Sequence, residues 1–568
     1  MDNDGSGARR APATTHALRA VAAAQAALAV FVALAAVAAP AARAAGVAHL
    51  RAQDCGALQG LALPASAIGL STGGAVVQTA VAVRADEKNN PNGDYCKVTG
   101  IVKPHDPRSP AMQFEVNLPL AWNGRALQFG GGAYDGTLVT GLGTFTMQPA
   151  GVPNALQRGF VTLGSDGGHQ AGPGFDGRFG LDDEALLNYG KQSVKRTHDV
   201  AVAIVRKAYG RAPARFYFIG GSQGGHEALD AAARYPQDYD GVVANFPAYN
   251  VTLLHLGSLN AGRALYENGG AGWVNASKTK RITDAVYAAC DRLDGAQDGI
   301  IANVAACNAA FDVTTLRCAG GADTGDDCLS DAQLAAVRKI TSDYAPGFAV
   351  AGMDSFPKWP LLDGALFQVS NFGQVRQPSN PISGKEALLY MAGDQTAKFI
   401  ITRNPELDTM RFDPAQWRAR IAQVAAIMDV SDVSLAKFRA RGGKLILTHG
   451  TADDFITPYN TVRYYERQVL EFGQAGVDRF VRFYLIPGFG HGFGPFDARF
   501  DSLAALQNWV EKGRAPAHLV AVDGNPNANR TRPLCEWPAW PKFTGASGTE
   551  NQAASFTCTA RSARGSAR

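Results

Sequence analysis

One short segment, a serine between two pairs of glycines, constrains the fold of this chain more than any other feature. It reads Phe-Tyr-Phe-Ile-Gly-Gly-Ser-Gln-Gly-Gly-His over residues 216–226. The apolar, β-favouring run stops at Gly220 and residues 227–234 have a helical composition, so the segment predicts a strand, a very tight turn and a helix. A serine on such a bend needs small neighbours, and the helix start directs backbone N–H groups at negative charge formed beside it. Ser222 is therefore a candidate nucleophile, although in a chain with 63 glycines the motif needs partners elsewhere.

Strand-like and helix-like segments alternate along much of the chain. A helical pattern lies at 194–208, and three apolar runs lead into loops, at residues 126–129, 160–163 and 216–219. Such alternation predicts a parallel α/β sheet, which resumes with strands at 444–447 and 480–486. Residues 251–430 lose this rhythm and contain helical patterns such as 331–343. We therefore predict one α/β catalytic domain built from residues 45–250 and 431–568, with residues 251–430 inserted into it.

Residues 1–44 have the pattern of a secretory signal peptide. Three arginines precede an Ala/Val/Leu run at 20–39, and Ala42-Arg-Ala44 offers small residues for cleavage. An uncleaved membrane anchor is the alternative, because the run approaches the length of a spanning helix. Cleavage would remove four basic and two acidic residues, so the formal charge falls from +4 to +2. We predict a periplasmic or secreted protein with no membrane association after cleavage and no nucleic-acid partner, and the sequence does not indicate an oligomeric state.

The eight cysteines favour disulfides, because an even count in an exported chain usually forms bridges. None shows the C-x-x-C spacing of a zinc site. Sequence alone does not fix the connectivity, and we expect pairing between sequence neighbours. The expected pairs are Cys55 with Cys96, Cys290 with Cys307, Cys318 with Cys328, and Cys535 with Cys558.

Two later loops supply the partners that Ser222 needs. In α/β-hydrolases an acid and then a histidine follow the serine in chain order, each on a loop after a strand. Asp453 follows the strand predicted at 444–447, and His491 follows the strand predicted at 480–486. In this arrangement Ser222 attacks an ester carbonyl, His491 moves its proton to the leaving alcohol, and Asp453 holds the imidazole in the useful tautomer. The sequence therefore predicts an α/β-hydrolase core that acts as a serine hydrolase.

Each of these partners has a rival close by. His226 lies on the helix that leaves the bend, and His449 precedes Asp453 in the same loop. We interpret His226 as a packing or surface residue and His449 as structural. Asp454 is the nearest alternative acid, and Asp453 is preferred because it lies four residues after His449.

The bend also predicts where a developing oxyanion is bound. One donor is the N–H of Gln223, the residue after the nucleophile, and the other comes from a glycine loop after an earlier strand. Residues 130–132 are three consecutive glycines that follow the strand predicted at 126–129. We assign Gln223 and Gly132 as the donors, with Gly131 as the alternative to Gly132.

An acidic loop in the inserted segment is a candidate metal site. Residues 290–300 read Cys-Asp-Arg-Leu-Asp-Gly-Ala-Gln-Asp-Gly-Ile, which places three carboxylates in one tight loop. Hard oxygen donors of this kind suit Ca²⁺, although the spacing is not that of an EF-hand. The candidate ligands are the side chains of Asp291, Asp294 and Asp298 and the backbone carbonyls of Ala296 and Ile300. The alternative is an Asp/Gly turn held by Cys290.

With these residues assigned, nearly all of the predicted mature chain resembles the tannase and feruloyl esterase family, which includes the mono(2-hydroxyethyl) terephthalate hydrolases. The resemblance includes Thr-Leu-Gly-Ser-Asp-Gly-Gly-His at 162–169, Tyr-Gly at 209–210 through the serine bend to Asp-Gly-Val at 240–242, and the acidic, acid and histidine loops. It implies an inserted lid at 251–430, structural Ca²⁺ in the acidic loop, and disulfides like those above. It also implies an exported carboxylic-ester hydrolase for small aromatic esters with hydroxycinnamoyl, galloyl or terephthaloyl groups.

The chain departs from this family at two positions beside the candidate catalytic residues. Family members usually carry a disulfide between the residue before the nucleophile and the residue after the histidine, and here these positions are Gly221 and Gly492. The loop around His491 contains four glycines, at 488, 490, 492 and 494. We therefore expect a more mobile histidine loop, with weaker thermal tolerance or a looser site.

The substrate remains open at this point. A carboxylated substrate would need a cation in the lid, and Lys398, Arg403 and Arg411 are candidates that the sequence does not rank. Two other functions are alternatives to an aromatic esterase. One is a general short-chain esterase, and the other is a non-catalytic phenolic- or carbohydrate-binding protein on a hydrolase scaffold.

Overall fold

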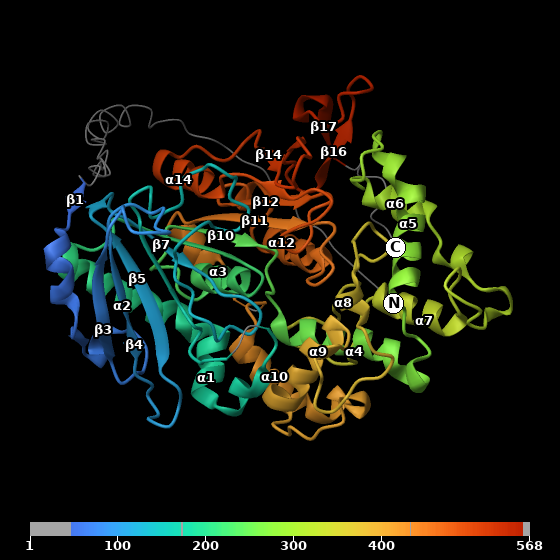
Figure 1. The fold of residues 1–568 in the computed structure, drawn as a ribbon, viewed down its shortest axis with the longest axis horizontal. Coiled ribbons are helices and arrows are strands. Elements are labelled where there is room, and N and C mark those ends of the chain that lie inside the picture. Colours follow the sequence, from blue (N-terminus) through green and yellow to red (C-terminus); the bar gives the residue numbers. More distant parts are fainter. Residues whose placement is uncertain (1–46, 172–173, 432, 561–568) are drawn as a thin grey trace, which may run out of the picture. The chain divides into compact units, whose positions relative to one another are not determined.

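A ten-stranded mixed sheet forms the centre of the computed structural model, which describes residues 47–171, 174–431 and 433–560 (Figure 1). The predicted signal peptide lies outside these residues. The strands lie in the order β12-β11-β10-β9-β7-β8-β5-β4-β3-β2. Their bounds are β2 Ala62–Leu63, β3 Ala75–Val83, β4 Tyr95–Val102, β5 Met112–Pro119, β7 Arg125–Phe129, β8 Val161–Ser165, β9 Arg215–Gly221, β10 Gly241–Asn245, β11 Lys444–Gly450 and β12 Val481–Ile486.

The sheet has a parallel half and an antiparallel half. Strands β12, β11, β10, β9, β7 and β8 pair in parallel. Strands β5, β4, β3 and β2 continue the sheet in antiparallel pairs. The loops that follow β9, β11 and β12 leave the same edge of the parallel half, because the carboxyl ends of parallel strands lie together. This edge is where the sequence places the serine, the acid and the histidine.

Alternating side chains of the central strands build two cores. In β9, Phe216 and Phe218 belong to one buried cluster, and Tyr217 and Ile219 belong to another. Successive side chains of a strand point to opposite faces, so each cluster covers one face of the sheet. The first cluster contains residues of α2, α3 and α12, and the second contains residues of α14. These helices are α2 Ser193–Tyr209, α3 Gln223–Ala233, α12 Pro458–Phe472 and α14 Ser502–Lys512.

The predicted elements agree closely with those of the structure. The strands predicted at 126–129 and 216–219 are β7 and β9, and the helix predicted at 194–208 is α2. The helix predicted at 331–343 is shorter, because it ends at Ile340. The next residue, Thr341, has a ψ of 20° and is no longer helical. Its hydroxyl donates to the Val337 carbonyl, which closes the last turn.

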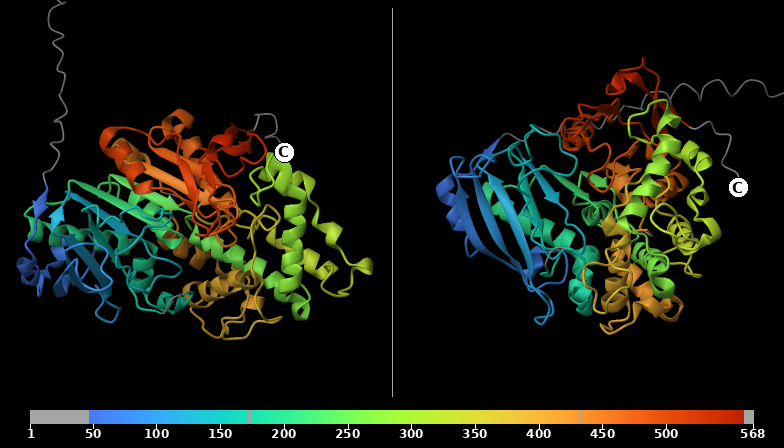
Figure 2. Two further views of the ribbon diagram at one scale, coloured as in Figure 1. Left: turned by 45° about the horizontal axis from the view of Figure 1, so that its top comes forward. Right: turned by 45° about the vertical axis from the view of Figure 1, so that its right-hand side comes forward.

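A helical lid is inserted between β10 and β11, and in Figure 2 its helices, coloured green to orange, form a group beside the sheet. One large buried cluster joins these helices and extends to residues of the catalytic domain such as Tyr134, Leu186 and Tyr189. Their bounds are α4 Val251–Gly270, α5 Ala276–Cys290, α6 Val304–Ala310, α7 Asp331–Ile340, α8 Val369–Phe372, α9 Leu388–Gln395 and α10 Arg418–Met428. The lid contacts the core near the predicted acid, where the Trp359 indole donates to the Phe455 carbonyl at 2.9 Å.

All eight cysteines form disulfides, and the connectivity is the predicted one. The bridges are Cys55–Cys96, Cys290–Cys307, Cys318–Cys328 and Cys535–Cys558. The last of them links Cys535 to the hairpin of β16 (Ala539–Phe543) and β17 (Phe556–Ala560).

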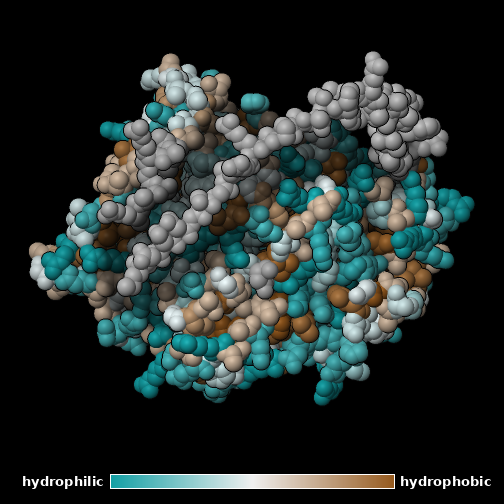
Figure 3. Space-filling model, turned by 180° about the vertical axis from the view of Figure 1, so that it is seen from behind, coloured by the Kyte–Doolittle hydropathy of each residue, from teal (hydrophilic) through white to brown (hydrophobic). Residues whose placement is uncertain are grey.

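The surface mixes polar and apolar residues. Figure 3 shows hydrophilic and hydrophobic residues interspersed on one face. The large exposed apolar side chains of the described chain are spread over several elements, although Val520 and Val522 share β14 (Val520–Asp523), and Phe493 lies in the histidine loop. Within the described residues, no helix combines the length and the apolar character needed to cross a membrane.

Candidate active site

The serine bend has the strained geometry that the sequence predicts. Ser222 lies between β9 and α3 with φ 60° and ψ −121°, a conformation that L-residues other than glycine rarely adopt. A Cβ at Gly220 would lie 2.2 Å from the Gly224 carbonyl oxygen, so the bend has no room for a side chain there. The glycines therefore allow the chain to reverse and to present the Ser222 hydroxyl at the end of the sheet.

The three predicted catalytic residues are joined by hydrogen bonds. The distance from His491 Nε2 to Ser222 Oγ is 3.0 Å, and the distance from His491 Nδ1 to Asp453 Oδ2 is 2.9 Å. Asp453 is fully buried, whereas the His491 side chain is 21% exposed and so remains accessible to a substrate. The arrangement allows a proton to pass from the serine to the imidazole while the carboxylate stabilises the imidazolium.

A dense set of donors holds the Asp453 carboxylate. Its Oδ1 accepts the N–H groups of Phe455 (3.0 Å) and Ile456 (2.9 Å). Its Oδ2 lies 3.2 Å from Nε2 of His449, in addition to its bond with His491. Burial alone would raise the pKa of Asp453, but His491 and His449 together hold this pKa well below its ordinary value.

The interaction between Asp453 and His491 also shifts the pKa of the histidine, in the opposite direction. Burial alone would lower the pKa of His491, but the Asp453 carboxylate, with a smaller contribution from Asp454, raises it above its ordinary value. The imidazole is therefore a stronger base than a free histidine, as a group that must take the proton of a serine requires.

The rival residues are placed elsewhere. His226 is buried in α3, where its Nε2 lies 3.2 Å from the Gly190 carbonyl oxygen and 3.3 Å from Asp230. His449 is buried behind Asp453 and contacts Thr461 and the Ile456 carbonyl. Asp454 lies beside the histidine, and burial followed by the charge of Asp453 raises its pKa to about 6.

The glycine loop lies next to the serine bend, but two of its N–H groups are already bonded to carboxylates. Gly131 N–H donates to Glu227 Oε2 at 2.7 Å, and Gly132 N–H donates to Asp135 Oδ1 at 3.0 Å. Gln223 is the first residue of α3, so its N–H has no partner within the helix. Gln223 thus fits the predicted oxyanion donor directly, whereas Gly132 can take that role only if its bond to Asp135 lengthens.

Two buried acids behind this loop have raised pKa values. Burial raises the pKa of Glu227 to about 7, although the Gly131 N–H opposes the shift. Burial, with the charge of Glu227 second, raises the pKa of Asp135 well above its ordinary value. Both acids therefore carry less negative charge near neutral pH than exposed carboxylates would.

Aromatic rings surround the exposed side of the histidine. The ring of Phe455 lies 5.4 Å from the His491 ring and 5.4 Å from the ring of Phe175, measured between centroids. Tyr134 continues the series at 5.2 Å from Phe175. Phe175 and Phe455 are only half-buried, so a flat substrate can contact them.

The three lid cations that the sequence proposed for a substrate carboxylate are paired with carboxylates of the protein. Lys398 is buried and lies 2.9 Å from Asp394. Arg403 pairs with Asp183, and Arg411, which is 89% exposed, pairs with Asp408. These contacts give no support for any of the three as a substrate ligand.

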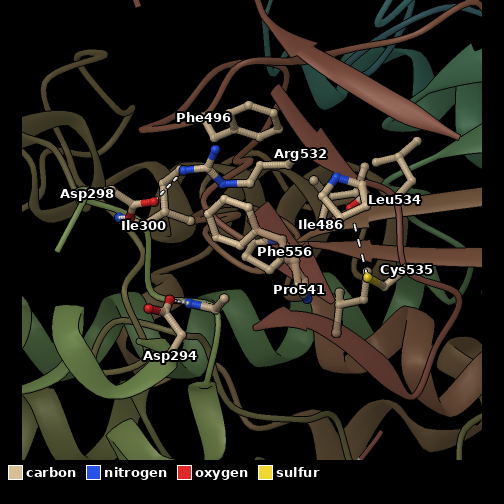
Figure 4. A pocket seen from close by; sticks show the side chains of 14 residues that line it. Asp294, Asp298, Ile300, Ile486, Phe496, Arg532, Leu534, Cys535, Pro541 and Phe556 are labelled. Atoms are coloured by element: carbon tan, nitrogen blue, oxygen red, sulfur yellow. Dashed lines mark hydrogen bonds and ion pairs between the residues drawn. The ribbon is translucent and has the colours of Figure 1, made fainter. Parts of the chain in front are cut away.

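The acidic loop contributes oxygen donors and negative charge to one region of the structure (Figure 4). Asp294 is buried, and burial raises its pKa to about 7, with the charges of Asp298 and Asp291 adding to the shift. Arg532 pairs with Asp298 and is the positive partner of the loop. Arg530 also reaches the loop, where it donates to the Asp298 carbonyl at 2.9 Å, but it pairs with Asp523. Among the described residues Asp291 and Asp294 form no salt bridge, which fits a divalent cation between them.

The three carboxylates of this loop lie farther apart than the ligands of a closed metal site. Within the described chain, the three carboxylates are not a group whose ligand oxygens all lie within 4.8 Å of one another. Their oxygens instead accept backbone N–H groups, for example Asp294 from Ala296 and Ala302. The donor set fits Ca²⁺ in kind and in charge, and binding would need these oxygens to turn toward a common point.

Another group has closer ligand atoms but already contains a cation. In the described chain, His198, Asp199 and Asp238 offer ligand atoms within 4.8 Å of one another. The Lys195 ammonium pairs with Asp199 at 2.6 Å and with Asp238 at 3.0 Å. The ammonium already occupies the position between the two carboxylates, so this cluster is an ion-pair network.

The histidine loop is held by more hydrogen bonds than its glycines suggest. Gly490 N–H donates to the Phe493 carbonyl at 2.6 Å, and Gly488 N–H donates to the Thr451 hydroxyl at 3.2 Å. The Asn525 amide donates to the Gly494 carbonyl at 2.9 Å. These bonds count against the expectation of a loose loop, while its thermal consequence stays a prediction.

Asp135, Glu227 and Phe246 lie around the site without belonging to a motif, and the sequence did not reveal them. Glu227 directly follows residues 216–226, at a helix position where a glutamate is normally expected at the surface. Asp135 follows the glycine loop by three residues, and only the left-handed backbone of Ala133 and Asp135 turns it back on that loop. An acid close to a glycine-rich turn is the sequence signal for Asp135 and Glu227, whereas Phe246 has none.

The fold and the site together define a class of protein: an α/β-hydrolase with a helical lid, in which a serine, a histidine and an aspartate are linked in the order Ser, Asp, His along the chain. The family model described as tannase and feruloyl esterase matches residues 96–559. The chain therefore belongs to the tannase and feruloyl esterase family, as its resemblance predicted.

Individual relatives agree with this assignment. An uncharacterized esterase of Agrobacterium fabrum is 38% identical over 515 residues, which cover 89% of this chain and 92% of that protein. A mono(2-hydroxyethyl) terephthalate hydrolase of Piscinibacter sakaiensis is 31% identical over 538 residues, covering 85% and 86% of the two chains. The crystal structure of feruloyl esterase B from Aspergillus oryzae shares the fold, with a TM-score of 0.73 at 22% identity, over 89% of this chain and 100% of that one. The protein is a carboxylic ester hydrolase.

Proposed function

We propose that the protein hydrolyses small aromatic esters through an acyl-enzyme formed on Ser222. The observation that carries the proposal is the continuous chain of hydrogen bonds from Ser222 through His491 to Asp453. Ser222 Oγ attacks the ester carbonyl while His491 Nε2 takes its proton, and the imidazolium then gives this proton to the leaving alcohol. Water repeats the sequence on the acyl-enzyme and releases the acid.

The oxyanion formed in each step needs donors that face the serine. Gln223 N–H supplies the first donor from the start of α3, where the helix dipole also favours negative charge. Gly132 N–H supplies the second when its bond to Asp135 lengthens. A donor that is pre-positioned in this way contributes about 10²- to 10³-fold to kcat in hydrolases.

The aromatic preference rests on the rings beside His491. Phe175 and Phe455 form a half-buried apolar wall next to the base, which suits a flat aromatic acyl group better than a short alkyl group. One relative is named a probable feruloyl esterase B, and another a mono(2-hydroxyethyl) terephthalate hydrolase. A hydroxycinnamoyl, galloyl or terephthaloyl monoester is the substrate class that we propose.

The remaining features of the proposal concern stability and location. Asp291, Asp294 and Asp298, with the carbonyls of Ala296 and Ile300, would hold a structural Ca²⁺ whose charge offsets that of the carboxylates. Four disulfides are typical of proteins that fold in an oxidising compartment, which supports export to the periplasm or the medium.

The test compares four esters at equal concentration: methyl ferulate, methyl gallate, mono(2-hydroxyethyl) terephthalate and a short alkyl ester. Product release is followed by chromatography for the wild type and for Ser222→Ala. We expect a preference for one aromatic acyl group, which the variant abolishes. Activity on the alkyl ester alone would remove the aromatic assignment and favour a general esterase, and full activity of Ser222→Ala would refute the acyl-enzyme.

A further inference from the structure

The ring of Phe246 occupies the space between the strand that carries the nucleophile and the catalytic histidine. Phe246 directly follows β10 and is 4% exposed. Its ring centroid lies 4.8 Å from that of the His491 imidazole. A Cβ added to Gly221, the residue before the nucleophile, would lie 2.8 Å from the Phe246 ring atoms Cε2 and Cζ. The ring therefore lies against the backbone at Gly221 on one side and near the imidazole on the other.

The backbone holds Phe246 in an unfavourable conformation to achieve this. Its φ is 34°, a left-handed value that is rare for a bulky side chain. Its N–H donates to the Thr448 carbonyl at 2.7 Å, in the strand that leads to Asp453. Such strain persists only where surrounding contacts over-determine it, and it occurs mainly at functional sites.

The histidine loop has few side chains of its own to fix the imidazole. His491 lies between Gly490 and Gly492, and a Cβ at Gly492 would meet no atom within 4 Å. The hydrogen bonds of the loop fix its backbone, but the plane of the imidazole depends on the bond to Asp453 and on the rings packed around it. Of those rings, Phe455 is half-buried on the accessible side, whereas Phe246 is buried.

We propose that Phe246 is a positioning residue, whose buried ring braces the His491 imidazole against the Gly221 backbone and so keeps Nε2 aligned with the Ser222 hydroxyl. The inference rests on the proposed function of Ser222, Asp453 and His491. It also explains why glycine stands at position 221, because any side chain there would meet the ring. A ring that packs on both sides holds an imidazole without any covalent link between the two loops.

The first test measures kcat and KM for Phe246→Ala on methyl ferulate, with active sites counted by fluorophosphonate labelling. We expect kcat per labelled site to fall about 10- to 100-fold, as for a misplacement of about 1 Å. KM should change less than about threefold, because the ring is buried away from the accessible side of the histidine. Phe160→Ala is the matched control, since Phe160 lies in the same buried cluster and packs on Tyr217. The control should lose stability but keep its kcat per labelled site.

The second test is a double-mutant cycle with Gly221→Ala. In the wild-type background the new methyl group would lie 2.8 Å from the Phe246 ring and must push the ring away. We therefore expect kcat to fall about tenfold. In the Phe246→Ala background the nearest remaining atom is Thr146 Cγ2 at 3.3 Å, so Gly221→Ala should cause little further loss. Additive losses in the two backgrounds would overturn the proposal. If Phe246→Ala does not fold, Phe246→Leu keeps most of the volume, and the same cycle is measured with it.

Failure of this inference is distinguishable from failure of the proposed function. If Ser222→Ala stays active, the acyl-enzyme itself is wrong. If Ser222→Ala is inactive while Phe246→Ala keeps its kcat per labelled site, the catalytic assignment stands and only the role of Phe246 is refuted. A fall in labelled sites with unchanged kcat per site would show that Phe246 is merely structural.

Discussion

Replacing Asp453 by asparagine tests the proton path of the site with almost no change in shape. Oδ1 accepts two backbone N–H groups, from Phe455 and Ile456, so the carbonyl oxygen of the new amide should stay at that position. The amide nitrogen then takes the place of Oδ2 and presents hydrogens to His491 Nδ1. An imidazole whose Nδ1 accepts a hydrogen bond carries its proton on Nε2, and this nitrogen can no longer take the proton of Ser222.

The expected cost is about 10⁴-fold in kcat, as for the same change in other triads. At 1.36 kcal/mol for each factor of ten, this corresponds to about 5.4 kcal/mol of lost transition-state stabilisation. Asp454→Asn is the control, because the neighbouring acid makes no hydrogen bond to His491 and should keep its kcat within about threefold at pH 8.

The assay is methyl ferulate hydrolysis at pH 8, with circular dichroism to show that both variants are folded. The reasoning is refuted if Asp453→Asn keeps more than about a tenth of the wild-type kcat, a loss of less than about 1.4 kcal/mol. It is also refuted if Asp454→Asn loses as much activity as Asp453→Asn, since the acid would then be misassigned.

Three further predictions follow from the charges of the described residues. Asp453 raises the pKa of His491 above its usual 6.5, and only the neutral imidazole accepts a proton. The acid limb of kcat/KM in a pH-rate profile should therefore lie above pH 6.5. A limb at or below that value contradicts the assignment. Burial raises the folded-state pKa of Glu227 to about 7, so the protonated carboxyl contributes stability below the unfolded pKa of about 4.5. This contribution is lost as pH rises through 7, where the carboxyl ionises in the folded protein. Glu227→Gln should therefore raise the melting temperature at pH 8 and not at pH 4. If the acidic loop holds Ca²⁺, a concentration of 100 times Kd should stabilise the fold by about 2.7 kcal/mol, seen as a higher melting temperature that EDTA reverses and Asp294→Asn abolishes; equal melting curves with Ca²⁺ and with EDTA would count against the site.

Local chemistry explains why the sequence revealed the catalytic residues so directly. The bend at Ser222 requires glycines at fixed places, and those glycines are visible in the sequence because no other residue fits a gap of 2.2 Å. Asp453 and His491 follow strands whose apolar runs end abruptly, so chain order alone brought them to one edge of the sheet. Sheet order, by contrast, depends on long-range pairing, and no pattern in the sequence indicates that β5 pairs with β8 in the antiparallel sense.

The residues that the sequence did not reveal act through tertiary contacts. Phe246 is one of 28 phenylalanines, and nothing in its neighbourhood distinguishes it until the chain brings Gly221 and His491 to either side of its ring. Motifs thus report constraints on the backbone, whereas the supporting side chains are set by packing.

The acids around the site show how the same chemical group serves opposite purposes. Asp453 must stay ionised to stabilise an imidazolium, and the histidines at 449 and 491 lower its pKa although it is fully buried. Asp135 and Glu227 lie behind the loop that should face the oxyanion, where an ionised carboxylate would repel the charge that forms in the transition state. Burial raises their pKa values, so they hold the N–H groups of the loop in place while carrying less of that opposing charge. The arrangement places negative charge on the side of the histidine and limits it on the side of the oxyanion, which is the polarity that ester hydrolysis requires.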